Sequence, residues 1–346
     1  MNISRRKAAV LFAAGAAAIT LKPGKLYADE KNQKLLKAQA LQKGDKVALI
    51  APGTNVCDPD DVAKAVAAVE YFGLVPVIAD ILTLIPGRKA VTPEERVNDL
   101  HTAFKDNSIK AVFAVRGGYG SARLLNHIDF NIIKRNPKIF VGYSDITALH
   151  IAINQKTGLV TFHGPVLLSA FNEYSASMFS KILFDNYSGE LINPDDVSGI
   201  RPAFPCRTIV PGKAEGQLTG GNLTLICSLM GTEFEIETKD KILFLEDVGE
   251  APYSIDRMLT QLRLAGKFKD IRGIVFGRCD DCTGSESTWD FSLGEVLDDQ
   301  LSDLAIPVIY GVTFGHTSNQ ITIPYGIKAE INSDVCGIKL LENALI

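Results

Sequence analysis

The feature that most constrains the fold is a series of short, unbroken apolar runs that alternate with segments of helical periodicity. The runs in the first half of the chain span residues 46–51, 74–79, 111–115 and 139–141. Apolar residues at helical spacing fill the intervals, for example from 60 to 72. Strands without polar alternation are buried on both faces, which is typical of a parallel sheet covered by helices. We therefore expect an α/β fold whose ligand binds at the carboxyl ends of the strands.

A second set of elements begins near residue 212. Its apolar runs span 241–245, 273–277 and 306–310, and alternating β elements follow from 321 onward. Several prolines interrupt the pattern between the two sets, as is usual in a connection between domains. We expect an N-terminal domain over 41–165, a connecting segment over 166–211, and a smaller α/β domain with β-rich closing elements over 212–346.

Residues 1–28 have the composition of an export signal. Arg5, Arg6 and Lys7 precede an apolar run over 8–21, and Ala28 offers a small residue for cleavage. The paired arginines resemble a twin-arginine signal, which exports folded proteins. The run is too short to span a bilayer, and no later segment approaches the necessary length. We therefore expect a periplasmic protein with no membrane span after the signal is removed.

Charge and cysteine usage restrict the partners and the redox chemistry. Removal of residues 1–28 leaves 31 basic and 40 acidic residues, a formal net charge of −9, which argues against nucleic acid and anionic membranes as partners. Cys279 and Cys282 have CxxC spacing without a second close pair, so a local disulfide is more plausible than a structural zinc site. We expect no metal and no cofactor. Buried thiols are expected at the remaining cysteines, Cys57, Cys206, Cys227 and Cys336.

A sharp turn, Gly142-Tyr143-Ser144-Asp145, joins the apolar run at 139–141 to a helical segment. A serine at a strand-to-helix turn exposes its hydroxyl, and the backbone N–H groups that follow point toward the group it attacks. Serine is also a good helix cap. The G-x-S-x-G motif is absent, but we expect Ser144 to serve in both ways, as cap and as nucleophile.

Two further polar residues follow apolar strands in the same manner, Glu246 and His316. A serine needs a base to become a nucleophile, and the base needs a carboxylate to fix its tautomer. His163 is an alternative base, and Asp247 or Glu250 could replace Glu246, because spacing alone does not separate them. The remaining histidines fall on or near predicted helices, where a structural or solvated role is expected.

Five segments in order along the chain resemble the LD-carboxypeptidase family of serine peptidases. They lie at 115–120, 140–147, 220–223, 245–257 and 314–316, within a resemblance that spans about 44–326. The family includes muramoyltetrapeptide carboxypeptidases and microcin C immunity peptidases. The resemblance implies a flavodoxin-like N-terminal domain, a smaller C-terminal domain, a site between them, and a homodimer. The export signal departs from well-known cell-wall recycling members, which act in the cytoplasm.

The resemblance also implies roles for individual residues. Ser144 would be the nucleophile, His316 the general base and then acid, and Glu246 the carboxylate that orients it. An oxyanion hole would come from backbone N–H groups.

By position, the oxyanion donors would be Gly118 or Gly117 together with Asp145. Glycine lets the backbone approach a developing oxyanion, and Asp145 opens a helix whose N–H groups point the same way. Arg116 lies beside the turn Gly117-Gly118-Tyr119-Gly120, hereafter the glycine turn. It is a candidate for binding the substrate's terminal carboxylate.

These observations favour a metal-independent serine carboxypeptidase that cuts an L-to-D peptide bond. The expected partner is a muropeptide or another peptide, and the expected product is the terminal D-alanine of a peptidoglycan tetrapeptide. Two alternatives stay open. The same triad could hydrolyse a peptide–nucleotide conjugate, or the chain could be a non-catalytic exported solute-binding protein in which Ser144 and His316 only bind a ligand.

Overall fold

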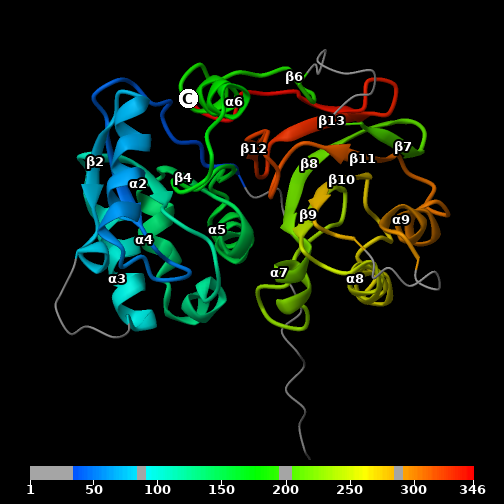
Figure 1. Ribbon diagram of the computed structural model, residues 1–346, viewed down its shortest axis with the longest axis horizontal. Coiled ribbons are helices and arrows are strands. Elements are labelled where there is room, and N and C mark those ends of the chain that lie inside the picture. Colours follow the sequence, from blue (N-terminus) through cyan, green and yellow to red (C-terminus); the bar gives the residue numbers. More distant parts are fainter. Residues whose placement is uncertain (1–33, 84–90, 195–204, 284–290) are drawn as a thin grey trace, which may run out of the picture. The chain divides into compact units, whose positions relative to one another are not determined.

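The computed structural model describes residues 34–83, 91–194, 205–283 and 291–346. The expected export signal at 1–28 lies outside these residues. Residues Leu35–Ile346 form one compact unit that contains two β-sheets (Figure 1).

The first sheet has six strands in the order β12-β5-β4-β3-β1-β2. These strands are β1 (Lys46–Ile50), β2 (Val75–Ile78), β3 (Ile109–Ala114), β4 (Ile139–Gly142), β5 (Phe162–His163) and β12 (Ile323–Pro324). Strands β1 to β5 are parallel, and only β12 pairs antiparallel, with β5. The order 2-1-3-4-5 is that of a flavodoxin-like sheet, so the expected fold class is confirmed.

Helices connect these strands and pack around the sheet (Figure 1). They are α2 (Pro59–Tyr71), α3 (Pro93–Lys105), α4 (Phe130–Arg135), α5 (Thr147–Thr157) and α6 (Glu173–Leu183), with 3₁₀ turns η1 (Asp80–Leu82), η2 (Ser121–His127) and η3 (Ser144–Ile146). The start of helix α3 is encoded in its local sequence. Thr92 and Glu95 form a reciprocal capping box, and Pro93 occupies the first turn.

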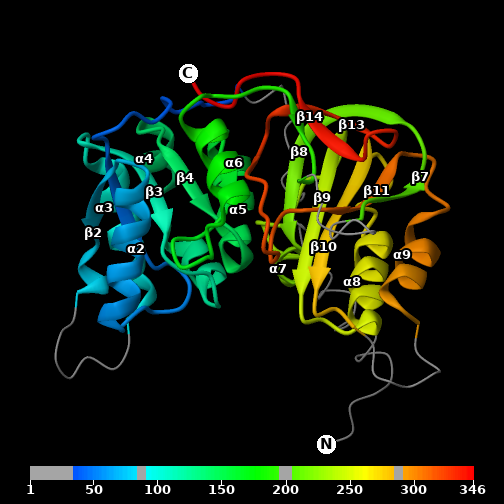
Figure 2. The same cartoon turned by 45° about the horizontal axis from the view of Figure 1, so that its top comes forward.

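The second sheet has eight strands in the order β6-β14-β13-β8-β9-β10-β11-β7. They are β6 (Glu190–Leu191), β7 (Arg207–Val210), β8 (Lys213–Asn222), β9 (Lys241–Val248), β10 (Gly273–Asp280), β11 (Val308–Val312), β13 (Lys328–Asn332) and β14 (Gly337–Leu340). Strands β8 to β11 form a parallel centre, and the outer strands pair antiparallel. Helix α7 (Leu223–Ser228) follows β8, and α8 (Pro252–Leu264) and α9 (Leu293–Leu301) lie side by side next to β10 and β11 (Figure 2).

The second sheet curls until its two ends meet. Strand β7 lies at one end of the order and β13 near the other, yet the Thr208 hydroxyl donates to Ser333 O at 3.1 Å. Gly212 N likewise donates to Ser333 Oγ at 2.9 Å. Cys206 and Cys336 form a disulfide at this junction. This disulfide joins the two ends of the curled sheet, and its cysteines are 130 residues apart in the sequence.

The prediction of four buried thiols is therefore wrong in part. Cys206 and Cys336 are paired, and Cys57 is exposed, so Cys227 alone is the buried free thiol that we expected. Local spacing could not reveal a pairing that depends on how the sheet curls. The predicted local disulfide between Cys279 and Cys282 is present.

Removing the long-range disulfide should lower stability substantially. A bridge that closes a loop of this length stabilises the fold by about 2–5 kcal/mol, chiefly because it restricts the unfolded chain. We expect the Cys206→Ala/Cys336→Ala variant to have a clearly lower thermal denaturation midpoint than wild type, measured by circular dichroism. The exposed free thiol provides the control, since Cys57→Ala removes no bridge and should leave the midpoint unchanged. Equal midpoints for the double variant and wild type would contradict this prediction.

The chain crosses from the second sheet back to the first between β11 and β12. Strand β11 ends at Val312 in the second sheet, and Ile323 in β12 already pairs with His163 in the first. Asn222 N, at the end of β8, donates to Thr147 Oγ1 at 3.0 Å and joins the two sheets near the start of α5. The segment that carries His316 is thereby placed beside the strand-to-helix turn that carries Ser144. Among the described residues, we find no helix that is long and apolar enough to cross a membrane.

Candidate active site

Ser144 lies two residues after the end of β4 and has a left-handed backbone, with a φ of +63°. Residues other than glycine rarely adopt this conformation, and strain of this kind concentrates at functional sites. The η3 turn and α5 that follow have no side-chain cap. The expected helix-capping role of Ser144 is therefore wrong, because the left-handed turn directs its hydroxyl away from the helix and toward His316.

The structure brings Ser144, His316 and Glu246 together from three separate segments. His316 Nε2 lies 3.0 Å from Ser144 Oγ, and His316 Nδ1 lies 2.7 Å from Glu246 Oε2. The backbone N–H of His316 also donates to Glu246 Oε2, at 3.3 Å. An imidazole that donates through Nδ1 to a carboxylate has Nε2 available to accept the serine proton.

The carboxylate of Glu246 is fully buried, whereas the His316 side chain is 19% exposed. The close approach of Gly315 makes this arrangement possible. A Cβ atom on Gly315 would lie 2.3 Å from Glu246 Oε2, and its φ of +79° also favours glycine. The Phe314-Gly315-His316 turn therefore requires glycine in order to place the imidazole on the carboxylate.

The environment of His316 raises its pKa above the ordinary value of 6.5. Burial by itself lowers the pKa, but the hydrogen bond and charge of Glu246 outweigh it, and the charges of Asp247 and Asp280 act in the same direction. The surroundings of His316 thus favour the protonated form of its imidazole.

The alternative base, His163, does not occupy this position. Its ring is fully buried beneath the site, in contact with the rings of Tyr143 and Phe244. Burial holds the pKa of His163 well below 6.5, with smaller effects from His150 and His316. Of the two candidates, only His316 is hydrogen-bonded to Ser144 in the described part of the chain.

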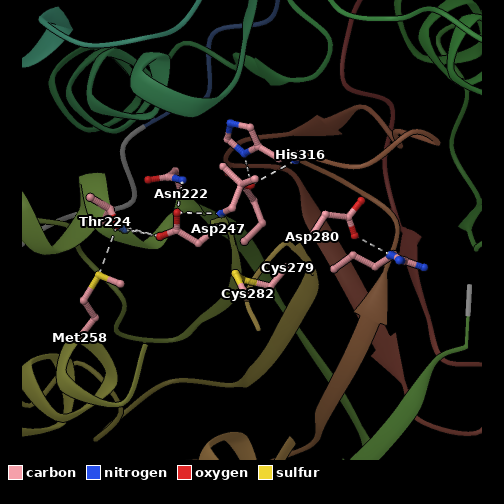
Figure 3. Close-up of a disulfide and its surroundings, with 11 residues drawn as sticks. Asn222, Thr224, Asp247, Met258, Cys279, Asp280, Cys282 and His316 are labelled. Carbon is pink, nitrogen blue, oxygen red and sulfur yellow. Dashed lines mark hydrogen bonds and ion pairs between the residues drawn. A yellow bond between two sulfur atoms is a disulfide. The ribbon is translucent and has the colours of Figure 1, made fainter. Parts of the chain in front are cut away.

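The alternative carboxylates have other positions. Asp247 is buried and accepts hydrogen bonds from Asn222 Nδ2 at 3.0 Å and from the Thr224 backbone and hydroxyl, both at 2.9 Å. Figure 3 shows this group around the start of α7, next to His316. Asp247 therefore secures α7 to β9. Glu250 makes no hydrogen bond with His316 among the described residues, so Glu246 is the candidate carboxylate that contacts this imidazole.

A disulfide and a carboxylate lie on the strand next to Glu246. Cys279 in β10 is the register partner of Asp247 in β9, and Cys279 is bonded to Cys282 (Figure 3). Asp280, between the two cysteines, forms an ion pair with Arg278 at 3.0 Å. This turn places the Asp280 charge near enough to His316 to contribute to its raised pKa.

The predicted oxyanion donors lie against Ser144. A Cβ atom on Gly117 would be 3.0 Å from Ser144 Cβ and 3.3 Å from Ser144 Oγ, so the glycine turn lies against the Ser144 side chain. Within the described residues, the backbone N–H groups of Gly118 and Asp145 donate no hydrogen bond. The side chain of Asp145 is buried and accepts from Ser121 N at 2.8 Å.

Arg116 is exposed and forms no ion pair or hydrogen bond with the other described residues. Arg116 lies two residues after the end of β3 and one residue before Gly117, the glycine that contacts Ser144. The structure therefore leaves it available to an anionic ligand. No group of three or more His, Cys, Asp or Glu side chains with metal-binding geometry occurs in the described ranges.

Two further residues of the site, Tyr143 and Thr54, were not predicted from the sequence. The ring of Tyr143 packs on His316, with centroids 4.7 Å apart, and thereby restricts the orientation of the imidazole. Thr54, in the loop after β1, bonds to the glycine turn. Its position at the carboxyl end of a predicted strand was the only signal that could have indicated it.

Comparison with known proteins places the chain in a family of peptidases. Residues 47–164 match the LD-carboxypeptidase N-terminal domain, and 215–331 match the LD-carboxypeptidase C-terminal domain. The chain is 41% identical over 297 residues to a probable murein peptide carboxypeptidase of Bacillus subtilis, covering 86% of this chain and 92% of that protein. The chain therefore belongs to the LD-carboxypeptidase family, and the predicted resemblance is confirmed.

Two other relatives illustrate the range of the family. The chain is 32% identical over 280 residues to the microcin C7 self-immunity protein MccF of Escherichia coli, covering 73% of this chain and 80% of that protein. It superposes on the crystal structure of a muramoyltetrapeptide carboxypeptidase from Oxalobacter formigenes with a TM-score of 0.73 and 30% identity, covering 85% and 97% of the two chains.

Proposed function

We propose that this peptidase is a serine-type LD-carboxypeptidase that releases the terminal D-alanine from a murein tetrapeptide. The observation that carries the proposal is the continuous contact from Ser144 through His316 to the buried Glu246, at 3.0 and 2.7 Å. The murein-related names of two relatives favour a cell-wall peptide as substrate. Membership of a peptidase family favours this proposal over a solute-binding protein.

The proposed reaction proceeds in two steps. Ser144 Oγ attacks the carbonyl carbon of the scissile bond while His316 Nε2 takes its proton, and the tetrahedral oxyanion is held by the N–H groups of Gly118 and Asp145. His316 then gives the proton to the leaving amine, and D-alanine departs from an acyl-enzyme. Water attacks the acyl carbon with His316 as base, which regenerates Ser144.

Arg116 supplies the recognition that an exopeptidase needs. A carboxypeptidase must bind a terminal carboxylate, and a guanidinium can form two parallel hydrogen bonds with one. Arg116 is exposed beside the glycine turn and pairs with no described side chain. In the proposed complex, it binds the carboxylate of the departing D-alanine.

Incubation of the mature protein with purified muropeptides, followed by mass spectrometry, tests the proposed function. The expected product is a tripeptide stem that has lost one alanine, together with free D-alanine. A serine-directed fluorophosphonate should label Ser144 in the same preparation. The proposal is wrong if tetrapeptides stay intact under conditions in which Ser144 is labelled.

A second substrate class has a specific basis in the 32% identity with MccF. The same triad could cleave a peptide–nucleotide conjugate, because the attacking and proton-transferring groups would be unchanged. A parallel assay with an aminoacyl sulfamoyl nucleoside separates the two functions. Preferential cleavage of the conjugate would favour the immunity-type activity.

We also propose that the protein is exported through the twin-arginine route. The Arg5-Arg6 pair carries this inference, and the two disulfides support it because such bonds persist mainly in oxidising compartments. In the native host, Arg5→Lys/Arg6→Lys should shift the protein from the periplasmic to the cytoplasmic fraction. An unchanged distribution in cell fractionation would contradict this route.

The homodimer implied by the resemblance stays a prediction.

A further inference from the structure

Three loops at the carboxyl ends of neighbouring strands converge on Ser144. The strands β1, β3 and β4 are adjacent in the sheet, and their loops carry Gly53, Gly117 and Ser144. A Cβ atom on Gly53 would lie 2.3 Å from Gly117 O and 2.7 Å from an Asp145 carboxylate oxygen. This space admits only glycine, so the loop after β1 forms a wall of the glycine turn.

Thr54 holds two successive peptide units of that turn. Its backbone N–H donates to Gly117 O at 2.9 Å, and its hydroxyl oxygen accepts from Tyr119 N at 3.0 Å. A trans peptide directs its N–H opposite to its C=O. Fixing Gly117 O toward Thr54 therefore turns the N–H of Gly118 away from Thr54. The contact is tight, because a Cβ atom on Gly118 would lie 2.0 Å from the Thr54 hydroxyl oxygen.

A turn with two adjacent glycines needs such a restraint. Glycine has more backbone freedom than any other residue, and Gly118 has a φ of +86°. Donors in an oxyanion hole act by being aligned before the charge develops. A peptide unit that rotates freely would have to be ordered at every turnover.

We propose that Thr54 is a positioning residue that directs the N–H of Gly118 at the oxyanion formed on the substrate. This inference rests on the proposed function of Ser144 as the nucleophile. Thr54 does not touch the reacting atoms and acts through the Gly117–Gly118 and Gly118–Tyr119 peptide units.

Other contacts anchor the surroundings of the turn independently of the Thr54 hydroxyl. Asp145 accepts from Ser121 N at 2.8 Å on the far side of the turn. Arg96 of α3 donates to Gly53 O and so holds the loop after β1. Removal of the Thr54 hydroxyl should therefore loosen the middle of the turn without unfolding the site.

Thr54→Val tests the proposal, because it keeps the shape and the backbone N–H but removes the hydroxyl oxygen. Complete loss of one oxyanion donor lowers kcat by about 10² to 10³-fold. We expect Thr54→Val to lower kcat by about 10 to 100-fold. The loss is smaller because the backbone N–H of residue 54 still binds Gly117 O, and only the restraint on the Gly118–Tyr119 peptide unit is removed. KM should change little, and Thr54→Ser should restore most of kcat.

Two measurements do not depend on the identity of the peptide. In Thr54→Val, the rate of fluorophosphonate labelling at Ser144 should fall, and hydrogen–deuterium exchange at the Tyr119 amide should accelerate. Thr157 provides the matched control, since its hydroxyl accepts from Leu159 N at 3.0 Å at the opposite end of α5. Thr157→Val should retain wild-type kcat per folded molecule.

The outcomes separate this proposal from the proposed function. Wild-type kcat and labelling in Thr54→Val, with an inactive Ser144→Ala, would overturn the role of Thr54 and leave the nucleophile assignment intact. Equal losses in Thr54→Val and Thr157→Val would also overturn it. If wild type cleaves no muropeptide, the labelling and exchange rates still decide the role of Thr54.

Discussion

Ser144→Ala is expected to lower kcat for D-alanine release by about 10⁶-fold, the loss typical of removing the nucleophile from a serine triad. The reason is that Ser144 Oγ lies 3.0 Å from His316 Nε2 and that, among the described residues, no other side-chain hydroxyl is hydrogen-bonded to His316. Alanine tolerates the left-handed backbone about as well as serine, so the fold should persist. Release of D-alanine, followed by mass spectrometry, is the measurement.

The serine variant tests the mechanism more cleanly than a histidine variant would. Without the His316 imidazole, the buried Glu246 carboxylate would keep only the backbone N–H of residue 316 as a donor, and breaking a buried ion pair costs about 3–5 kcal/mol. His316→Ala could therefore be inactive because it unfolds. Ser144→Ala should also abolish fluorophosphonate labelling, while its circular dichroism spectrum and denaturation midpoint match wild type. Substantial D-alanine release by a folded Ser144→Ala protein would refute the nucleophile assignment.

Glu246→Gln should reduce kcat by about 10⁴-fold, as replacing the triad carboxylate with its amide does elsewhere. The amide NH₂ can donate to His316 Nδ1, which favours the tautomer that carries its proton on Nε2 and cannot accept from Ser144. The substitution keeps the size of the side chain and removes a buried charge. It therefore tests the orientation of His316 more than the packing of the site.

The same variant should change the pH dependence of the reaction. The general base must be neutral, so kcat/KM in wild type should fall as the pH decreases through the raised pKa of His316, above 6.5. Glu246→Gln removes the hydrogen-bonded charge that raises the pKa of His316. Burial lowers this pKa, and in the variant the charges of Asp247 and Asp280 are left to oppose it. The acid limb of the residual activity should consequently move to lower pH.

Glu250→Gln is the matched control, because it neutralises a carboxylate of the same strand-to-helix connection that is not hydrogen-bonded to His316 in the described part of the chain. Its acid limb should coincide with that of wild type. A shift in Glu250→Gln but none in Glu246→Gln would transfer the orienting role to Glu250 and contradict the proposed triad.

Much of the fold follows from local sequence patterns. Unbroken apolar runs indicated the parallel strands, and Thr92, Pro93 and Glu95 marked the start of α3, because strand burial and helix capping depend on neighbours in the chain. The same patterns predicted Ser144, Glu246 and His316 just after strands, although β9 continues past Glu246 to Val248 because the chain keeps pairing with β10 there. Ordered family motifs then favoured these three over His163, Asp247 and Glu250.

Other features depended on segments that are distant in sequence. The Cys206–Cys336 disulfide arises because the second sheet curls, and no local pattern encodes that curvature. The helix cap predicted at Ser144 is absent because the left-handed backbone of Ser144 directs its hydroxyl toward His316. His316 is 172 residues further along the chain. Thr54 likewise stands in no distinctive motif. Its proposed positioning role depends on a hydrogen bond with Tyr119, which is 65 residues further along the chain.

The sequence by itself determined which residue types stand at the strand ends, and therefore the class of chemistry that they can perform. The tertiary structure alone decided which of them meet. The chain crosses from the second sheet to the first between β11 and β12, and this crossing carries the imidazole to the serine turn. Hydrogen bonds act over about 3 Å, so pairing Ser144, His316 and Glu246 requires the packing of two sheets, which no local pattern specifies.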